Sequence, residues 1–222
     1  MMSEQMIRIT AEDGHIFDAF HSKPENPKGG LVILQEIFGM TEQLKSVTRA
    51  WCADGYDSIL PAMYDRIKPN TVISFDDMEG AQGMMKQFDP DSVVKDIRAA
   101  VAAVDRGKGV SLIGFCWGGG TATRMASILD LTATISYYGT RLAENAANGA
   151  NCATLFHFGE SDQHASPEVI EGVKQNILDA ECYVYDAGHA FANDARANFY
   201  VEGAAKLARQ RSLEFLNRVH GA

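Results

Sequence analysis

Several features are scarce in this chain of 222 residues, and each absence narrows the class of protein. No apolar run approaches the roughly 20 residues of a membrane-spanning helix, so we expect no membrane partner. The first five residues lack the basic patch and apolar stretch of a signal peptide. The four cysteines are widely spaced and form no CxxC pair, which argues against a disulfide framework. Free thiols in a reducing cytoplasm are the expectation for Cys52, Cys116, Cys152 and Cys182.

Positive charge is also in short supply, with 20 Lys and Arg against 29 Asp and Glu, for a formal net charge of −9. An acidic surface repels phosphate backbones, so we expect no nucleic-acid partner. Hydrophobic residues at 46% and charged residues at 22% are ordinary globular values, which excludes disorder over most of the chain. No composition shift, low-complexity tract or repeat marks a boundary, so we predict a single domain over residues 1–222.

Short apolar runs alternate with amphipathic stretches from residue 31 onward. This alternation predicts an α/β fold with a mainly parallel central sheet and helices on both faces. A hairpin around residues 12–14 would add an antiparallel edge at the N-terminus. The predicted strands are 5–10, 15–21, 31–34, 56–60, 110–114, 133–138, 154–158 and 183–185. The predicted helices are 41–54, 91–106, 117–129, 167–178 and 202–219, while the Met-rich stretch 70–87 shows no clear pattern.

The most informative stretch is Gly114-Phe115-Cys116-Trp117-Gly118, where an apolar strand breaks into a helix. Glycines two positions before and after the cysteine let the backbone cross closely at a sharp bend. This is the G-x-S-x-G nucleophile elbow, with cysteine in place of serine. The amino end of the following helix favours a thiolate and helps to stabilise an oxyanion. The pattern therefore points to Cys116 as a nucleophile.

Three other interpretations of this turn compete with the elbow. Cys116 could be only a small buried residue in a Gly-rich turn, as cysteine often is. A phosphate loop needs lysine before Thr121, where Gly120 stands. A dinucleotide-binding G-x-G-x-x-G motif also fails, because Cys116 occupies the place of its second glycine.

A nucleophile of this kind needs an acid and then a histidine later in the chain. The strand at 154–158 opens into a loop that carries Asp162, and the strand at 183–185 opens into a loop that carries His189. Parallel strands place both loops on the same sheet edge as Cys116. The histidine would hold the thiolate as an ion pair and shuttle a proton, and Asp162 would fix its tautomer. The sequence thus predicts a triad of Cys116, Asp162 and His189.

Neighbouring residues leave alternatives open. Glu160 and Asp186 compete with Asp162 as the acid, and a loop carboxylate is more often a turn former or a helix cap. His164 is the nearest rival to His189, but it stands beside Asp162 instead of at a later strand end.

His157 lies inside an apolar strand, which is typical of a core histidine with satisfied hydrogen bonds. Together with Asp162 and His164 it could in principle bind a metal ion. Their spacing matches no known metal motif, and a nucleophile–histidine–acid triad works without a cofactor. We therefore expect neither a metal nor a cofactor.

Six short segments of the chain, taken in their order along the sequence, resemble the dienelactone hydrolase family of the α/β-hydrolase fold. The resemblance covers almost the whole chain, and the ordered set of motifs is more specific than any one of them. The segments are Gln35–Gly39, Pro61–Tyr64, Gly114–Gly119, Tyr137–Gly139, His157–Asp162 and Gly188–Phe191. The resemblance implies a cysteine-dependent hydrolase of lactones or esters, with Cys116, His189 and Asp162 as its triad.

The resemblance also implies roles for three further residues. A family glutamate at the place of Glu36 interacts with the resting thiol and is proposed to accept its proton when substrate binds. The backbone N–H groups of Ile37 and Trp117 would form the oxyanion hole. Glu36 directly follows an apolar strand, where burial would make it a usable base. From the residues alone, a solvated loop glutamate that caps a turn is the simpler interpretation.

The chain departs from the family at the arginines that hold the carboxylate of a dienelactone. Asn193 stands at the place of one, four residues past the histidine. Residues 70–89, which should supply the other, contain Lys86 but no arginine. Arg196 or Arg66 could substitute. Without a bidentate clamp, recognition of a substrate carboxylate is weaker.

A cysteine acyl-enzyme is a thioester, and thiolate leaves more readily than most alkoxides or amines. The tetrahedral intermediate that precedes this thioester therefore expels the thiolate again unless the substrate has a good leaving group. An enol lactone provides such a group, and an amide does not. We predict hydrolysis of small lactones or activated esters by a monomer or small homo-oligomer. Candidates to line the substrate pocket are Tyr138, Phe191 and Asn193, although strand-end aromatics are more often core.

Two other functions compete with this one. A carboxylesterase for uncharged esters is supported by the missing arginines. A non-hydrolytic, redox-responsive binding protein would keep the fold and an oxidisable Cys116.

Overall fold

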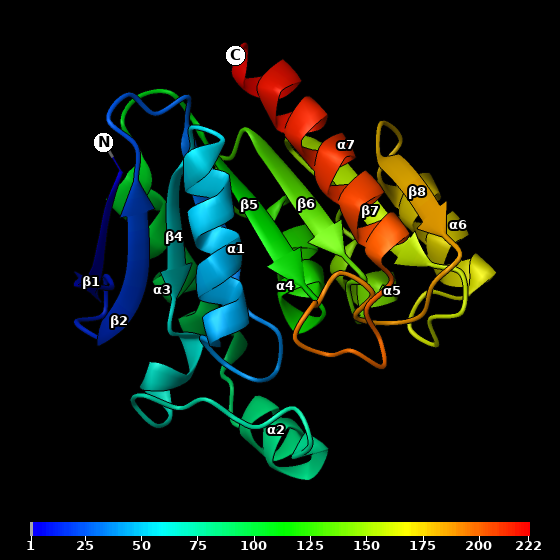
Figure 1. Ribbon diagram of the computed structural model, residues 1–222, viewed down its shortest axis with the longest axis horizontal. Coiled ribbons are helices and arrows are strands. Elements are labelled where there is room, and N and C mark those ends of the chain that lie inside the picture. The colour runs from blue at the N-terminus through cyan, green and yellow to red at the C-terminus, as the bar shows by residue number, and fades with distance from the viewer. Residues whose placement is uncertain (1) are drawn as a thin grey trace. The chain divides into compact units, whose positions relative to one another are not determined.

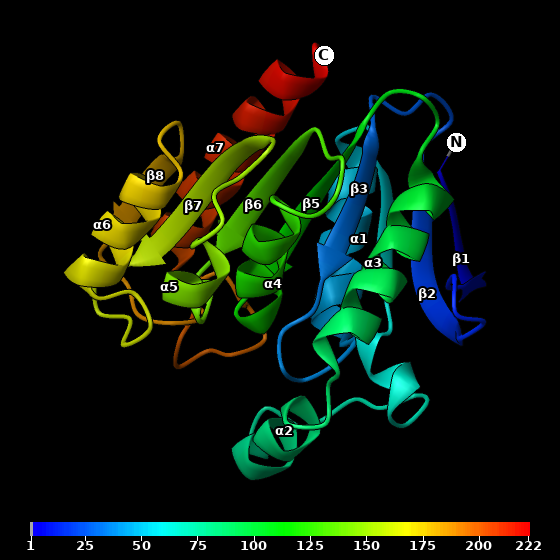
Figure 2. The ribbon, with the colours of Figure 1, turned by 180° about the vertical axis from the view of Figure 1, so that it is seen from behind.

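The computed structural model of the protein describes residues 2–222. Contacts between Cα atoms group the chain into two compact units, the first ending at Val110 and the second covering Ser111–Ala222. In each unit, helices lie on both faces of the strands (Figures 1 and 2). The single-domain organisation over 1–222 stays a prediction.

The first unit is built on four strands in the order β1-β2-β4-β3. Strand β2 pairs antiparallel with both β1 and β4, and β3 pairs parallel with β4. The predicted antiparallel edge at the N-terminus is therefore confirmed. These strands are β1 (Ser3–Thr10), β2 (Ile16–Lys23), β3 (Gly30–Leu34) and β4 (Asp57–Pro61).

Two long helices cover opposite faces of this sheet, with α1 nearer the viewer in Figure 1 and α3 in Figure 2. Each begins at a side-chain cap, where Thr41 accepts the N–H of Leu44 at 3.3 Å and Asp89 accepts the N–H of Ser92 at 3.0 Å. Helix α1 ends before Gly55, whose φ of 100° suits only glycine well. The helical elements are α1 (Glu42–Ala53), η1 (Met63–Arg66), α2 (Met78–Met85) and α3 (Pro90–Val104).

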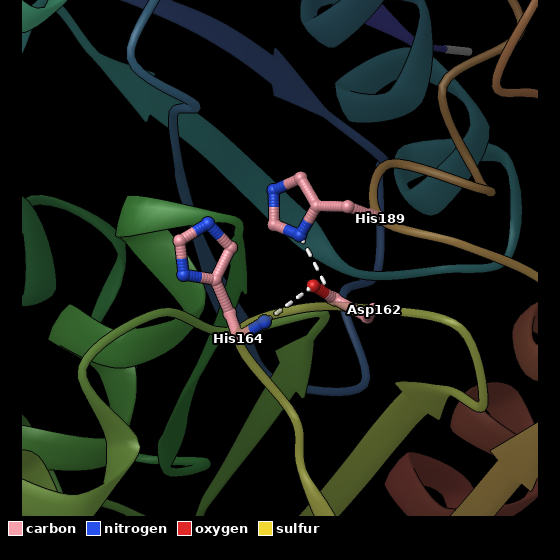
Figure 3. Close-up of side chains that lie close together, drawn as sticks. All are labelled: Asp162, His164 and His189. Carbon is pink, nitrogen blue, oxygen red and sulfur yellow. Dashed lines mark hydrogen bonds and ion pairs between the residues drawn. The ribbon is translucent and has the colours of Figure 1, made fainter.

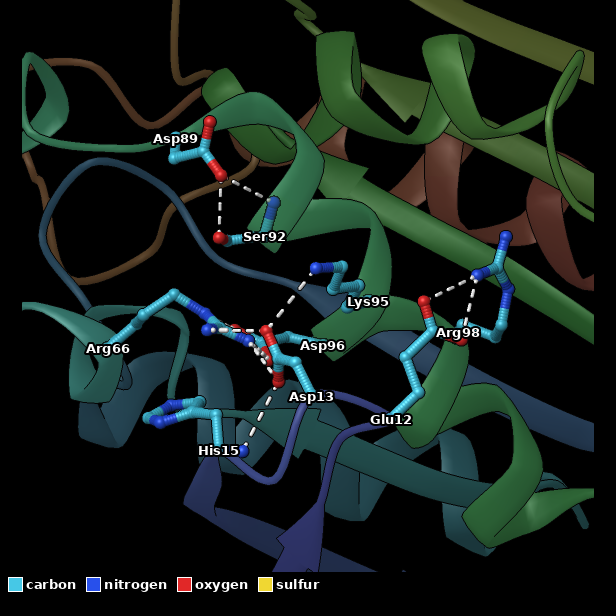
Figure 4. A network of polar contacts seen from close by, with 9 residues as sticks. All are labelled: Glu12, Asp13, His15, Arg66, Asp89, Ser92, Lys95, Asp96 and Arg98. Atoms are coloured by element: carbon cyan, nitrogen blue, oxygen red, sulfur yellow. Dashed lines mark hydrogen bonds and ion pairs between the residues drawn. The ribbon is translucent and has the colours of Figure 1, made fainter.

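Arg66 in η1 is the centre of a polar network within the first unit (Figure 4). Its guanidinium donates to Asp96 of α3 at 2.5 and 2.9 Å and to Asp13 of the β1–β2 turn at 3.0 Å. The hydrogen bond from Arg66 lowers the pKa of Asp13 to about 2. Arg66 is thus already paired with two carboxylates and joins three segments of the unit.

The second unit has four strands in the order β5-β6-β7-β8, each parallel to its neighbour. The mainly parallel sheet that the alternating pattern predicts is confirmed. In register, Phe115 pairs with Tyr137, and Tyr137 pairs with His157, so these carboxyl ends meet at one edge. The strands are β5 (Val110–Phe115), β6 (Ala133–Tyr137), β7 (Ala153–Gly159) and β8 (Glu181–Tyr185).

Helix α7 lies across one face of this sheet, while α4, α5 and α6 lie on the other, as opposite views show (Figures 1 and 2). Helix α4 packs closely on β6, because a Cβ at Gly119 would lie only 2.9 Å from the carbonyl oxygen of Tyr137. Helix α6 begins at Ser166, whose hydroxyl accepts the N–H of Val169 at 3.4 Å. The helices are α4 (Trp117–Met125), α5 (Leu142–Asn145), α6 (Pro167–Asn176) and α7 (Glu202–His220).

His157 on β7 is a core histidine with both ring nitrogens hydrogen-bonded, as predicted. Its Nδ1 lies 2.8 Å from the hydroxyl of Tyr185, and its Nε2 lies 2.8 Å from the hydroxyl of Ser212. The hydroxyl of Tyr137 lies 2.7 Å from the same serine oxygen. Burial lowers the pKa of His157 to about 3, so the ring is neutral near pH 7. The network ties β6, β7 and β8 to α7.

The strands and longer helices agree with those predicted, and three short helical elements were not predicted. Elements η1 and α5 have four residues each, too few for an apolar period, and α2 lies in the Met-rich stretch without a clear pattern. Helix α4 ends at Met125, four residues earlier than predicted. Over residues 2–222, no helix has the length and apolar character needed to span a membrane.

Candidate active site

Cys116 lies at the bend between β5 and α4, where the elbow pattern places it. Its backbone has φ 55° and ψ −115°, a conformation rare for a residue with a side chain. Its N–H donates to the carbonyl of Tyr137 at 3.0 Å, and its carbonyl accepts the N–H of Thr140 at 3.1 Å. These hydrogen bonds to the end of β6 and to the residues after it hold the bend in place. Surrounding structure of this kind allows a strained backbone conformation to persist.

Gly114 allows the chain to cross itself at this bend. A Cβ at Gly114 would lie 1.9 Å from the carbonyl oxygen of Gly118 in the first turn of α4. No side chain can be accommodated there unless the strand or the helix moves. The two glycines of the elbow thus set the position of the cysteine between them.

His189 and Asp162 form a hydrogen-bonded pair in the loops that follow β8 and β7 (Figure 3). The distance from His189 Nδ1 to Asp162 Oδ2 is 2.8 Å. The carboxylate is fully buried, and the imidazole is 23% exposed. A buried carboxylate that holds one imidazole nitrogen leaves the other nitrogen to act on a nucleophile.

The loop around Asp162 positions its carboxylate through backbone hydrogen bonds. The N–H of Asp162 donates to the carbonyl of Gly159, and the N–H of Ser161 donates to the carbonyl of Ala187, at 3.2 and 3.0 Å. The backbone N–H of His164 donates to Asp162 Oδ1 at 2.9 Å. One carboxylate oxygen therefore faces the loop, and the other faces His189.

Burial, the largest single effect, lowers the pKa of His189, but hydrogen bonds to Asp162 and Cys116 raise it to about 10. The imidazole is therefore protonated at neutral pH, with a carboxylate on one side and the cysteine on the other. The second unit thus contains the hydrogen-bonded pair of His189 and Asp162 together with Cys116.

The two rival acids differ from Asp162 in burial. Glu160 and Asp186 are exposed, whereas the Asp162 side chain is buried against the histidine. His157 is held in the core by Tyr185 and Ser212. Residue spacing alone could not choose among these side chains. Burial distinguishes Asp162 from the two rival acids, and hydrogen bonds place His157 in the core.

Aromatic rings pack around the His189 imidazole. The Tyr138 ring meets it edge-on with centroids 5.2 Å apart, and Phe191 meets Tyr138 in the same way at 5.4 Å. Tyr138 and Phe191 are both buried, and Tyr138 has a φ of 38°. These contacts hold the histidine loop, while the predicted pocket-lining role of the two residues stays a prediction.

Asn193 occupies the position where the resemblance predicts an arginine, and it is buried. Its Oδ1 accepts the N–H of Ala195 at 3.1 Å, and its N–H donates to the carbonyl of Ala190 at 2.9 Å. The side chain therefore supports the turn after His189. It brings no positive charge to this position.

Glu36 and Ile37 belong to the first unit, directly after β3. Glu36 is buried, with 3% of its surface exposed. The hydroxyl of Tyr64 donates to the carbonyl of Ile37 at 2.6 Å, and Gln35 accepts the N–H of Met63 at 3.2 Å. The solvated glutamate that the residues alone favoured is therefore wrong for Glu36, and its catalytic role stays a prediction.

His164 was considered as a rival base and as one of three possible metal ligands, and the structure places it next to the catalytic candidates. Its ring and that of His189 have centroids 5.1 Å apart, at 63° (Figure 3). Asp162, His164 and His189 each offer a ligand atom within 4.8 Å of the others. His157, which was weighed with Asp162 and His164 as a possible metal ligand, is instead engaged in the core. No sequence signal links His164 to His189, since they lie in different loops.

Known proteins with similar sequences and structures are hydrolases. The model of the dienelactone hydrolase family matches residues 17–220. A carboxymethylenebutenolidase of Pseudomonas putida is 33% identical, with 97% of each chain covered. A putative dienelactone hydrolase from Klebsiella pneumoniae superposes with a TM-score of 0.85 at 25% identity, over 96% of this chain and 98% of the other. A Pyrococcus furiosus esterase shares the fold, with a TM-score of 0.69 at 14% identity, over 98% of this chain and 93% of the other.

Proposed function

This chain belongs to the dienelactone hydrolase family and is an α/β-hydrolase that acts on ester bonds, and we propose that it cleaves small lactones or activated esters with Cys116 as its nucleophile. The observation that carries the proposal is the 2.8 Å hydrogen bond between His189 and the buried Asp162, with Cys116 close enough to raise the pKa of that histidine. In this chain His189 is the general base and acid, and Asp162 orients it.

In the proposed reaction, the thiolate of Cys116 attacks the carbonyl carbon of the ester. The new C–S bond forms as the carbonyl electron pair moves onto oxygen. When the carbonyl re-forms, the bond to the leaving oxygen breaks, and His189 gives that oxygen its proton. Water, losing a proton to the now neutral His189, then cleaves the thioester and releases the acid. The thiolate and imidazolium are restored.

The oxyanion needs hydrogen-bond donors aimed at it. Trp117 is the first residue of α4, so its N–H lies at the positive end of that helix. We assign one donor to this N–H and, on the family resemblance, the second to Ile37. On the same basis, Glu36 is assigned the role of accepting the proton from Cys116 when the thiol is protonated, which yields the thiolate that attacks. Its burial supports that role, because a buried carboxyl is a stronger base than a solvated one.

The other cysteines provide a control for the nucleophile. Burial raises the pKa of both Cys152 and Cys182 to about 11, so they hold little thiolate at neutral pH. Cys116→Ala should reduce the hydrolysis of p-nitrophenyl acetate to near background, and Cys152→Ala should retain the wild-type rate. Equal rates for Cys116→Ala and wild type would refute the proposed mechanism.

Uncharged esters are the favoured substrates within this class. Asn193 replaces an arginine and supports a turn, and Arg66 is paired with two carboxylates. A substrate carboxylate therefore lacks a bidentate partner at these two positions. We expect kcat/KM to be higher for p-nitrophenyl acetate than for a dienelactone, each corrected for its uncatalysed rate. A preference for the dienelactone would establish an acidic lactone as the substrate and contradict the uncharged-ester assignment.

A further inference from the structure

His164 adds a third ligating side chain to the catalytic histidine and aspartate. It follows Asp162 by two residues, and its backbone N–H holds that carboxylate at 2.9 Å. Its imidazole is exposed and lies beside that of His189 (Figure 3). The three side chains offer ligand atoms that all lie within 4.8 Å of one another.

Two imidazoles and one carboxylate are ligands typical of zinc and similar divalent transition metals. We propose that Asp162, His164 and His189 bind one divalent transition-metal ion, of which Zn²⁺ is the representative. Magnesium and calcium are disfavoured at this site, since they require mostly oxygen ligands.

The arrangement needs little change to coordinate such an ion. With metal–ligand bonds of about 2.0–2.2 Å, tetrahedral ligands stand about 3.3–3.6 Å apart. The observed separations of up to 4.8 Å therefore have to close by at most about 1.2–1.5 Å. Asp162 is fixed by its loop, whereas His164 is exposed and can turn toward the ion. Its chain neighbour Gln163 is also exposed, so solvent reaches this loop.

A metal at this site would stop hydrolysis, a consequence that rests on the proposed function of His189. An ion on Nδ1 replaces the proton with which Nδ1 donates its hydrogen bond to Asp162, and that proton is released to solvent. An ion on Nε2 occupies the nitrogen that acts on Cys116. In either case the imidazole can no longer carry a proton between the thiol and the leaving oxygen.

Binding is tested with Zn²⁺ alone by titration calorimetry, so the readout does not depend on activity. We expect one ion per chain for wild type and for Cys116→Ala, which removes the competing thiol ligand. His164→Ala should bind at least about tenfold more weakly, as expected for loss of a ligand. The matched control is Gln163→Ala, which changes an exposed neighbour in the same loop.

The visible spectrum of bound Co²⁺ provides a second readout. The proposal predicts tetrahedral ligand-field bands without a thiolate charge-transfer band, and loss of these bands in folded His164→Ala. Unchanged Zn²⁺ affinity in His164→Ala, or loss of binding in Cys116→Ala, would overturn the proposed site.

Inhibition separates the metal site from the catalytic proposal. Zn²⁺ should inhibit wild-type hydrolysis of p-nitrophenyl acetate, EDTA should restore it, and Gln163→Ala should behave like wild type. Each variant's rate is compared with its own metal-free rate, and the half-inhibiting Zn²⁺ concentration should rise at least about tenfold in His164→Ala. Binding without inhibition would support the metal site and contradict the catalytic role of His189.

Discussion

At the scale of single residues, the elbow combines a strained cysteine with a glycine that permits the strain. Cys116 has a positive φ, and two backbone hydrogen bonds to the end of β6 and the residues after it hold the bend. Gly114 lies where the carbonyl of Gly118 leaves no room for a side chain. A side chain at position 114 would push the strand or the helix aside, and Cys116 would then move away from His189.

Gly114→Ala is therefore expected to reduce both activity and stability. The added methyl group would lie 1.9 Å from the Gly118 oxygen, and we expect a loss of about 3 kcal/mol or more in the free energy of unfolding. Urea unfolding and the hydrolysis rate measure the two effects. The control is Gly172→Ala in α6, where a Cβ meets nothing within 4 Å. Because alanine favours a helix more than glycine does, Gly172→Ala should raise the free energy of unfolding by about 0.5–1 kcal/mol. Equal stability of the two variants would contradict this account of the elbow.

The candidate site could be predicted from sequence where a motif encodes it. The elbow glycines, the strand ends and the order of the acid and the histidine led to Cys116, Asp162 and His189. The proximity of His164 to His189 could not be predicted, because it depends on how two loops fold toward each other. The turn-supporting role of Asn193 was hidden for a similar reason, since it depends on a hydrogen bond to the backbone of Ala195.

At the scale of elements, a buried polar network joins the strands that carry the site to helix α7. His157 on β7 contacts Tyr185 at the end of β8, and Ser212 of α7 contacts both His157 and Tyr137 of β6. Tyr137 also accepts the backbone N–H of Cys116 through its carbonyl. The network therefore links the packing of α7 to the strand end that holds the backbone of Cys116.

Because His157 is buried in this network, the free energy of unfolding should fall as the pH drops. Burial holds the pKa of His157 near 3 in the folded chain, against about 6.5 for an ordinary imidazole in the unfolded chain. The unfolded state therefore binds more protons between pH 6.5 and 3, and stability falls as the pH drops through that range. From this histidine alone we expect a loss of about 2 kcal/mol between pH 7 and pH 5.

Urea unfolding of wild type and His157→Gln at pH 7 and pH 5 tests this expectation. The variant should lose less stability than wild type over the same interval, whatever its stability at pH 7. The same pH-dependent loss in both proteins would contradict the assignment to His157.

The elements themselves were predictable where apolar residues recur with a clear period. Strands β3 and β5 are continuous apolar or small-residue runs, and α3 presents apolar residues at helical spacing. Element η1 has no such period, and Arg66 within it is held by carboxylates from the β1–β2 turn and α3. A short element fixed by distant side chains leaves no local signal in the sequence.

At the scale of the whole molecule, the predicted single domain has two compact units, each with one tryptophan. Trp51 lies in α1 of the first unit, and Trp117 begins α4 of the second. The chain therefore contains a separate fluorescent reporter for each unit.

If the chain unfolds as one domain, both reporters should change together. Trp51→Phe leaves only Trp117, and Trp117→Phe leaves only Trp51. In each variant the fluorescence transition in urea should coincide with the far-ultraviolet circular dichroism transition of the same protein. A fluorescence transition separated from the circular dichroism transition in either variant would show that the units unfold independently.

The most direct test of the central claim is to identify the residue that carries the acyl group during turnover. Wild-type enzyme is mixed with p-nitrophenyl acetate, quenched in acid within a single turnover, digested and analysed by mass spectrometry. We predict one acetyl group on the peptide that contains Cys116, removable by neutral hydroxylamine as a thioester is. Acetyl groups confined to other residues, or full turnover by Cys116→Ala, would contradict the account.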